Sequence, residues 1–465
     1  MKSVSEIKKK GHCYLVSNET RDYYLLLPII YFLETYKNYS ISLEFIWDAH
    51  KIKTEKPDLV ILPNTRGHNL YYEVGKYCIE NDILVFSHDS EGNFNNTEKT
   101  DYWGYNKTKE LFCPIVFTWN LRIKNYLNQS CGIPIEKIKI SGSPIFDKYI
   151  YLKPKTRTEI LSKYKKDHFT KVVGYAGWAF GKIYNKELND VLVYLDKGKE
   201  EGINWLTNQR DFVENCLKTL IELHPDTLFI LKKHPRENFE SDFRDSRNEM
   251  NRLKDFPNVL YLKDEEEIQD LIGISDLWMA FESTSIMEAW LLNVPTMLIN
   301  EIDDFKRVSL HQGSFKVNTI EKAIQAFEKL FSENDKSFFN PSNIVEKRNK
   351  IFADSIGYSD GLNHLRAINF FSPYLENNSS KNKKIKTNYK FLRLYLLLHI
   401  GKFFYSKRIF SKLPKFKKTI WVFENYKLTK IKNQKKSVYE DLAIFYKKMD
   451  LKNKIESNQI WNEIE

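Results

Sequence analysis

The sequence contains little glycine and little cysteine, and both shortages exclude classes of protein. Only 17 of its 465 residues are glycine, which excludes fibrous and low-complexity chains. Its five cysteines are scattered along the chain, and no pair of them has the spacing of metal ligands. We therefore expect a cytoplasmic protein with reduced thiols, and not a secreted scaffold held together by disulfide bonds.

Long apolar runs are also missing from the sequence. The N-terminal residues, MKSVSEIKKKG, contain no apolar stretch like that of a signal peptide, so no signal peptide is expected. No run reaches about 18 consecutive apolar residues, so no transmembrane helix is expected. Hydrophobic residues nevertheless make up 42% of the chain, which allows large cores, and 465 residues are enough for two or three domains.

Strand-like apolar runs alternate with helical patterns in two series. The first series extends from Cys13 to the run that begins at Ile138, and the second begins at Val172 after a polar, lysine-rich stretch. Such alternation predicts mainly parallel sheets covered by helices. We therefore predict an α/β protein with two Rossmann-like domains, residues 1–155 and 165–375, that face a cleft.

The net charge of +11 comes from one C-terminal segment. From Lys381 to Lys436 the sequence has 18 Lys or Arg residues and one acid, which gives +17 and leaves −6 for the rest of the chain. We predict that residues 381–465 form a basic, mainly helical segment, after a flexible linker at 377–387. Two interpretations of its helix, residues 388–413, stay open: it lies on an anionic membrane surface, or it packs on the body with its lysines in water.

The first motif with chemical content is the end of TLFILKKHPRE, which starts at Thr227. Apolar strand formers lead into His234, and Pro235 stops the strand. Lys233 and Arg236 flank the imidazole. At the tip of a strand an imidazole can bond a phosphate oxygen or protonate a leaving group. A purely structural histidine is the alternative.

The second motif, Glu282-Ser283-Thr284-Ser285, lies between an apolar run and a predicted helix. One Ser or Thr is enough to cap a helix, so three in a row, together with free backbone amides, indicate an anion site. Glu288 fits a capping box with Ser285, or could reach a ribose hydroxyl. Both motifs are predicted at the carboxyl ends of strands, where doubly wound sheets bind ligands, so we expect them to face one crevice.

Two acids follow a third apolar run. Asp89 and Glu91 come after the strand-like residues 83–86, and Gly92 permits a tight turn. A carboxylate there can accept the proton of an acceptor hydroxyl, and a solvated acidic loop is the alternative. Gly177, after the first strand of the second domain, lets the backbone approach a phosphate. No second cluster supports a metal site, so we expect neither a metal nor another cofactor.

Together these motifs resemble those of GT-B-fold transferases, above all bacterial sialyltransferases and capsule Kdo transferases that use CMP-activated sugars. His234 and Pro235 match the His-Pro motif of that group, Ser283 and Ser285 its paired serines, and Glu91-Gly92 its acidic-Gly motif. One departure is that two acids often stand directly before the glycine, whereas this sequence has Asp89-Ser90-Glu91-Gly92. Which carboxylate acts therefore stays open. GSPIFDKY, KKHPRE and ESTSIMEA also resemble surface-carbohydrate biosynthesis proteins.

The resemblance implies a glycosyltransferase of capsule or lipopolysaccharide biosynthesis that works without a metal. Its donor would be a CMP-activated nonulosonate or Kdo-type sugar, bound by residues 165–375, and its acceptor a saccharide or lipid-linked saccharide on the side of residues 1–155. The implied catalytic residues are Asp89, Glu91 and His234. The implied substrate-binding residues are Gly177, Lys233, Arg236, Glu282, Ser283, Thr284, Ser285 and Glu288.

Two other functions fit the same residues. Teichoic-acid glycerophosphotransferases share a similar His-Pro and Ser arrangement and use CDP-alcohols, and a non-catalytic sugar-nucleotide-binding protein could have the same fold. We expect a cytoplasmic protein, with attachment to the inner face of the membrane as one open interpretation of the basic helix. Nucleic acid is not expected as a partner, because the α/β domains contain no recognition module.

Overall fold

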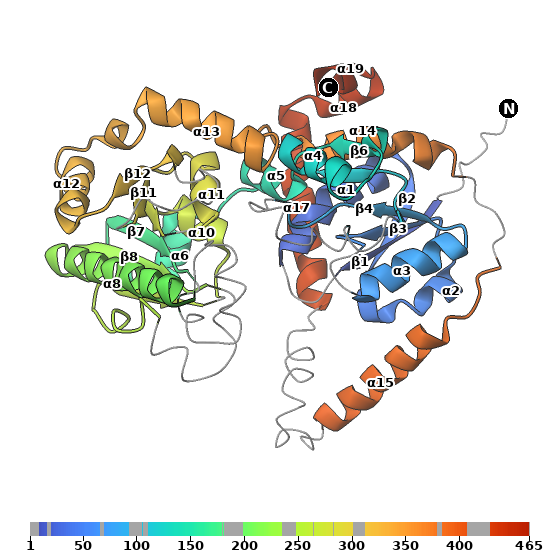
Figure 1. Ribbon diagram of the computed structural model, residues 1–465, viewed down its shortest axis with the longest axis horizontal. Helices are drawn as coiled ribbons and strands as arrows, with labels where there is room; N and C mark the ends of the chain where they lie inside the picture. Colours follow the sequence, from blue (N-terminus) through green and yellow to red (C-terminus); the bar gives the residue numbers. More distant parts are fainter. Residues whose placement is uncertain are drawn as a thin grey trace. The chain divides into compact units, whose positions relative to one another are not determined.

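The computed structural model describes residues 9–15, 20–65, 69–92, 105, 110–178, 180, 199–234, 248–263, 265–281, 283–300, 312–378, 384–406 and 428–464. They belong to two compact units (Figure 1). Unit 1 combines Met1–Leu152 with Ile356–Glu465, and unit 2 is Lys153–Ser355. The chain therefore leaves unit 1 and returns to it.

Unit 1 is built around a four-stranded sheet in the order β2-β1-β3-β4, in which every pairing is parallel. Its strands are β1 (Lys9–Leu15), β2 (Tyr39–Phe45), β3 (Leu59–Leu62) and β4 (Leu84–Ser87). A separate parallel pair is formed by β5 (Val116–Thr118) and β6 (Ile138–Ile140). Every residue of β3 is buried, as is usual for a strand inside a parallel sheet.

The helices of unit 1 come from both ends of the chain. Those before residue 153 are α1 (Thr20–Tyr36), η1 (Ile46–Asp48), α2 (Lys51–Glu55), α3 (Asn69–Glu80), α4 (Leu121–Gln129), η2 (Ile135–Lys137) and α5 (Pro144–Tyr151). Those after residue 355 are α14 (Asn363–Glu376), α15 (Tyr389–Ser406), α17 (Leu428–Lys448), α18 (Leu451–Glu456) and α19 (Gln459–Glu463). Among the described helices, none combines the length and the apolar composition needed to span a bilayer.

The predicted helical character of the C-terminal residues is confirmed, and their described part belongs to unit 1. Helix α17 packs on α1, and its Leu442 is completely buried. A buried chain of hydrogen bonds joins three helices: Asp147 accepts from His364 Nδ1 at 2.8 Å, and His364 Nε2 lies 2.9 Å from the hydroxyl of Tyr446. Helix α14 likewise belongs to unit 1, so the predicted domain 165–375 runs past the end of unit 2.

The predicted flexible linker is also held in place where the structure describes it. The hydroxyl of Tyr77 donates to the carbonyl of Lys386 at 2.6 Å, and the amide of Lys386 donates to Asn81 at 2.9 Å. Ile385, between the linker lysines, is buried in the core of unit 1. These contacts fix residues 384–387 against α3 and the turn that follows it. Residues 379–383 lie outside the described part.

Unit 2 contains a six-stranded parallel sheet in the order β12-β11-β10-β7-β8-β9. Its strands are β7 (Lys171–Ala176), β8 (Thr227–Lys232), β9 (Val259–Leu262), β10 (Leu277–Ala280), β11 (Thr296–Ile299) and β12 (Phe315–Val317). Numbered from β7, this is the doubly wound order 3-2-1-4-5-6, and the order reverses between β7 and β10.

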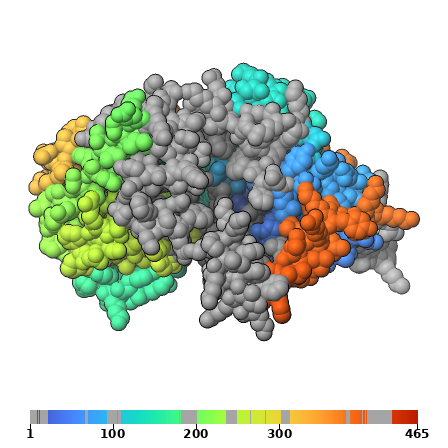
Figure 2. Space-filling view, turned by 60° about the horizontal axis from the view of Figure 1, so that its bottom comes forward, coloured from blue at the N-terminus to red at the C-terminus, as the bar shows by residue number. Residues whose placement is uncertain are grey.

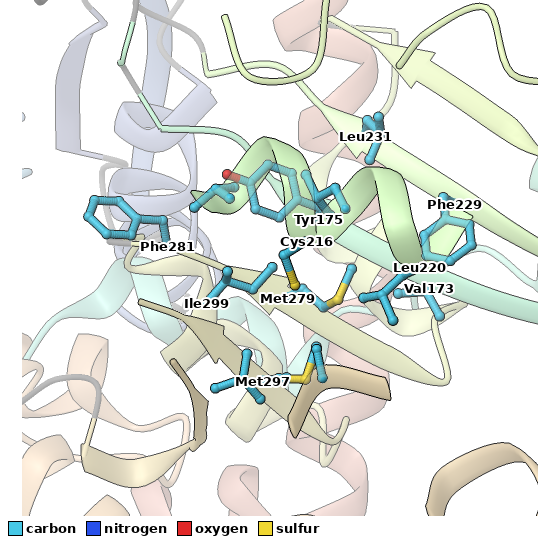
Figure 3. Close-up of a cluster of buried hydrophobic side chains, with 14 of the residues drawn as sticks. Val173, Tyr175, Cys216, Leu220, Phe229, Leu231, Met279, Phe281, Met297 and Ile299 are labelled. Atoms are coloured by element: carbon cyan, nitrogen blue, oxygen red, sulfur yellow. The ribbon is translucent and has the colours of Figure 1, made fainter. Parts of the chain in front are cut away.

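The helices of unit 2 cover this sheet. They are α6 (Arg157–Lys163), α8 (Lys199–Leu223), α10 (Ile268–Gly273), α11 (Ser285–Leu291), α12 (Ile320–Phe331), η6 (Lys336–Phe339) and α13 (Ser342–Ser355). Alternate residues of a strand point to the same face. Tyr175, Phe229 and Met279 therefore share one face, where they pack with Cys216 and Leu220 of α8 (Figure 3).

The opposite face of this sheet accommodates a buried tryptophan. Trp278, in β10, is completely buried, and Gly174 of β7 is its cross-strand partner. A Cβ atom on Gly174 would overlap the indole ring, so the glycine makes room for it. The four cysteines whose side chains the structure describes are buried and form no disulfide bond.

Candidate functional site

Three neighbouring strands of unit 2 end at one edge of the sheet. In the register of the sheet, Ala176 at the end of β7 pairs with Lys232 at the end of β8 and with Ala280 at the end of β10. Because the strands are parallel, the residues after them all lie at this edge. The edge includes the reversal of strand order between β7 and β10, where doubly wound sheets bind ligands.

The residues that follow the three strands include most of the predicted donor site. Gly177 follows β7, Lys233 and His234 follow β8, and Ser283 comes three residues after Ala280. The structure thus brings the backbone positions of His234 and Ser283 to one sheet edge. Pro235, Arg236 and Glu282 lie outside the described residues.

The loop after β7 is fixed by a carboxylate that the sequence analysis missed. Glu249 is completely buried, and its Oε1 accepts from the hydroxyl of Tyr175 at 2.9 Å and from the amide of Trp178 at 3.1 Å. The amide of Gly177 donates to the carbonyl of Lys232 at 2.8 Å. A Cβ on Gly177 would lie 3.0 Å from that carbonyl oxygen, so glycine permits the close approach of the two backbones.

The hydrogen bonding between β8 and β9 continues one residue beyond the end of β8. The amide of Lys233 donates to the carbonyl of Leu262 in β9 at 2.9 Å, and the side chains of Lys232 and Lys233 are both buried. His234 is half-buried, so its imidazole keeps access to solvent while the backbone before it is held in the sheet. A side chain in this position can contact a ligand while the hydrogen bonds of the strand stay intact.

The two serines of the Ser motif have different surroundings. Ser285 is buried, and its hydroxyl accepts a hydrogen bond from the indole of Trp278 at 3.0 Å. Ser283 is half-buried, and its hydroxyl accepts from the amide of Ser285 at 3.3 Å. Thr284 is exposed. The Ser283 hydroxyl is therefore the more accessible of the two to a ligand.

The predicted capping box of Ser285 and Glu288 is wrong. Helix α11 begins at Ser285, so the N-cap residue is Thr284, whose side chain makes no capping hydrogen bond. The hydroxyl of Ser285 instead satisfies the indole N–H of Trp278, which is buried in the sheet and needs an acceptor. Glu288 is half-buried on the same helix.

The acidic motif belongs to unit 1 and follows β4. Asp89 is buried and Glu91 is half-buried. The carbonyl of Asp89 accepts from the indole N–H of Trp119 at 3.0 Å. A Cβ on Gly92 would lie 2.5 Å from the Trp119 ring, so the loop rests directly on this side chain. Glu91 is thus presented from a firmly packed loop.

His88 packs beneath this loop as a neutral imidazole. Its Nδ1 lies 3.2 Å from the carbonyl of Asp89, and its Nε2 lies 2.9 Å from the hydroxyl of Ser141. Since a carbonyl can only accept, Nδ1 carries the proton. The ring stacks on Phe117 with 5.3 Å between the centroids. Burial lowers the pKa of His88 to about 4, so it is uncharged at neutral pH.

The described residues contain no group of three or more His, Cys, Asp or Glu side chains placed to hold a metal ion. The predicted site residues fall into both units. Asp89 and Glu91 are in unit 1, whereas Gly177, Lys233, His234, Ser283, Thr284, Ser285 and Glu288 are in unit 2.

Comparison with known proteins identifies the fold. No family model matches the chain, and no curated protein matches it. Among solved structures, a putative UDP-N-acetylglucosamine 2-epimerase from Listeria monocytogenes matches with a TM-score of 0.52 at 13% identity, covering 80% of this chain and 98% of the other. UDP-GlcNAc 2-epimerase from Methanocaldococcus jannaschii matches with a TM-score of 0.50 at 16% identity, covering 78% and 99%.

A further UDP-N-acetylglucosamine 2-epimerase structure has a TM-score of 0.51 at 11% identity and covers 81% of this chain and 99% of that one. At such low identity the likeness concerns the fold. Together with the parallel sheets it confirms the predicted α/β class of GT-B type, with a helical C-terminal segment.

Proposed function

We propose that the protein is a glycosyltransferase of bacterial surface-polysaccharide biosynthesis. It would transfer a sugar of nonulosonate or Kdo type from a CMP-activated donor to a saccharide or lipid-linked saccharide. The observation that carries the proposal is the sheet edge where Gly177, His234 and Ser283 follow three neighbouring strands. Imidazole and hydroxyl groups at such an edge suit the phosphate of a nucleotide.

The reaction assigns a role to each group. The oxygen of the acceptor hydroxyl attacks the anomeric carbon, and the bond from that carbon to the donor phosphate oxygen breaks, so that CMP leaves. The imidazole of His234 donates a hydrogen bond or a proton to the leaving phosphate, and the hydroxyl of Ser283 donates to another of its oxygens. A carboxylate takes the hydroxyl proton. The greater exposure of Glu91 supports Glu91 over Asp89 for this step.

Product analysis tests the proposal. The protein is incubated with CMP-activated nonulosonate or Kdo and a panel of saccharide acceptors in excess EDTA, because the proposed reaction uses no metal. Release of CMP together with a new glycosidic product is expected. A phosphodiester product from a CDP-alcohol would show a glycerophosphotransferase instead, and conversion of UDP-GlcNAc without an acceptor would show an epimerase.

A double variant separates an enzyme from a binding protein. Asp89→Asn with Glu91→Gln removes both candidate bases but leaves unit 2 unchanged. We expect it to keep its affinity for the donor nucleotide and to lose transfer. If the wild type binds the nucleotide but transfers no sugar to any acceptor, a sugar-nucleotide-binding protein is the better account.

A further inference from the structure

Helix α15 has apolar side chains on two sides, and one of these sides packs on the rest of unit 1. Phe391 is buried and meets the ring of Tyr77 edge-on, with 5.4 Å between the centroids. The ring of Tyr395 lies 3.9 Å from that of His50. Lys390 anchors the same region through an ion pair with Glu73 at 2.6 Å. This side fixes the orientation of the helix on unit 1.

The other side of α15 is an exposed apolar surface, which we call the α15 stripe. It consists of Tyr389, Leu392, Leu396, Ile400 and Phe403, whose exposed fractions are 77%, 39%, 51%, 52% and 59%. Their spacing of three or four residues places them along one face of the helix. Figure 2 shows the orange atoms of this part of the chain at the surface of the molecule. A helix that is apolar on every side is normally buried, so this stripe has the character of a contact surface.

The α15 stripe could contact a second copy of the chain or a lipid surface, and the charges around it distinguish these two partners. Arg393 is exposed on α15, and Lys384 and Lys386 are exposed just before it. Helix α15 contains no acid, and the sequence from Lys381 to Lys436 carries +17. A second copy of the chain would bring the same positive charge to the contact and be repelled. An anionic lipid surface offers the opposite charge together with an apolar interior.

We propose that α15 docks the protein onto an anionic membrane. The stripe enters the boundary between headgroups and acyl chains, and Arg393 with the neighbouring lysines contacts the anionic headgroups. The helix lies in the plane of the interface, because its opposite side remains packed on unit 1 through Phe391. Helices that bind at a membrane surface lie in this plane, with apolar side chains at the acyl boundary and cations at the headgroups.

Co-sedimentation of the full-length protein with vesicles tests the proposal. Vesicles of phosphatidylglycerol and phosphatidylcholine are compared with pure phosphatidylcholine at low and high salt. The wild type should pellet with the anionic vesicles, and less so at high salt because the headgroup attraction is screened. The variant Leu396→Ser/Ile400→Ser/Phe403→Ser should partition at least about tenfold less.

The matched control replaces three exposed apolar residues on other helices. Ile79, Val345 and Ile444 are 48%, 40% and 67% exposed, and lie in α3, α13 and α17. Their combined replacement by Ser removes a similar apolar surface and should change partitioning by less than about twofold. Both triple variants should stay folded, because all six side chains are exposed. An equal loss in the two variants would contradict a specific role of the stripe.

Two more measurements complete the test. An environment-sensitive fluorophore on Ile400→Cys should shift to shorter wavelength when anionic vesicles are added, whereas one on Ile444→Cys should not. Sedimentation velocity without lipid should give the same monomer for the wild type and the stripe variant. The proposal is overturned if the wild type fails to pellet at low salt. It is also overturned if the stripe variant converts a wild-type dimer to a monomer, since the stripe would then join two copies of the chain.

Discussion

At the scale of single residues, Ser283 and Ser285 should behave differently although the sequence pairs them. The Ser285 hydroxyl is the acceptor for the buried indole of Trp278, so Ser285→Ala leaves a buried donor unsatisfied. We expect it to lower the free energy of unfolding by about 1–3 kcal/mol. Ser283→Ala should leave stability nearly unchanged and weaken CMP binding more than cytidine binding. Chemical denaturation and isothermal titration measure these effects, and equal losses of CMP and cytidine affinity would show that Ser283 does not meet the phosphate.

His88 should make stability depend on pH. Its pKa is lowered to about 4 by burial, whereas an unfolded histidine titrates near 6.5, so the unfolded state binds more protons between these values. The free energy of unfolding should therefore fall as the pH falls from about 6.5 to about 4, by roughly 3 kcal/mol from this residue. Denaturation of the wild type and of His88→Gln across this pH range gives, for each protein, the slope of the free energy of unfolding against pH. Identical slopes would contradict the assigned protonation state.

At the scale of elements, the strands of unit 2 could be predicted well from the sequence. Each strand is a short apolar run that ends at a polar break, and the alternation with helices implies parallel pairing. Because His234 and Ser283 each come after such a run, the sequence predicted that they share one sheet edge. The partner of Ser285 could not be predicted, because the pattern does not reveal that the indole of Trp278 turns toward the start of α11. Glu249 was missed because it stands alone in a polar stretch without a motif.

The loop after β7 provides a prediction about this missed residue. Glu249 holds the loop through Tyr175 and the amide of Trp178, and so positions Gly177. Glu249→Ala should raise the donor KM by about 10-fold or more while kcat changes less, because each lost hydrogen bond to the carboxylate is worth about 1.5–3 kcal/mol. Glu249→Gln keeps one acceptor oxygen and should recover most of the loss. An Ala variant with the KM of the wild type would show that the loop does not contact the donor.

At the scale of the whole molecule, the return of the chain to unit 1 was the largest departure from expectation. It depends on contacts between residues more than two hundred positions apart, such as those of Asp147 with Asn363 and His364. Local patterns of polar and apolar residues do not predict such long-range contacts. The sequence suggested a basic helical segment beyond a flexible linker, yet the apolar face of α17 is part of the core of unit 1.

Two residues of α17 test this packing. Leu442 is completely buried and Ile444, two positions later, is 67% exposed. Leu442→Ala should lower the free energy of unfolding by about 2–5 kcal/mol, as expected for a buried leucine. Ile444→Ala should change it by less than about 0.5 kcal/mol. For the same reason, deletion of residues 381–465 should yield an insoluble protein. If both substitutions are neutral and the truncated protein stays folded, α17 is a separable tail.

Whether His234 holds the donor phosphate at the edge of β7, β8 and β10 is tested most directly by nucleotide affinity. CMP and cytidine are titrated into the wild type, His234→Ala and the control His168→Ala, which replaces an exposed histidine of the same unit. The wild type and the control should prefer CMP over cytidine, and His234→Ala should lose about 10- to 150-fold of this preference, the value of a hydrogen bond to a charged group. Undiminished CMP affinity in a folded His234→Ala protein would contradict the assignment of this edge as the donor site.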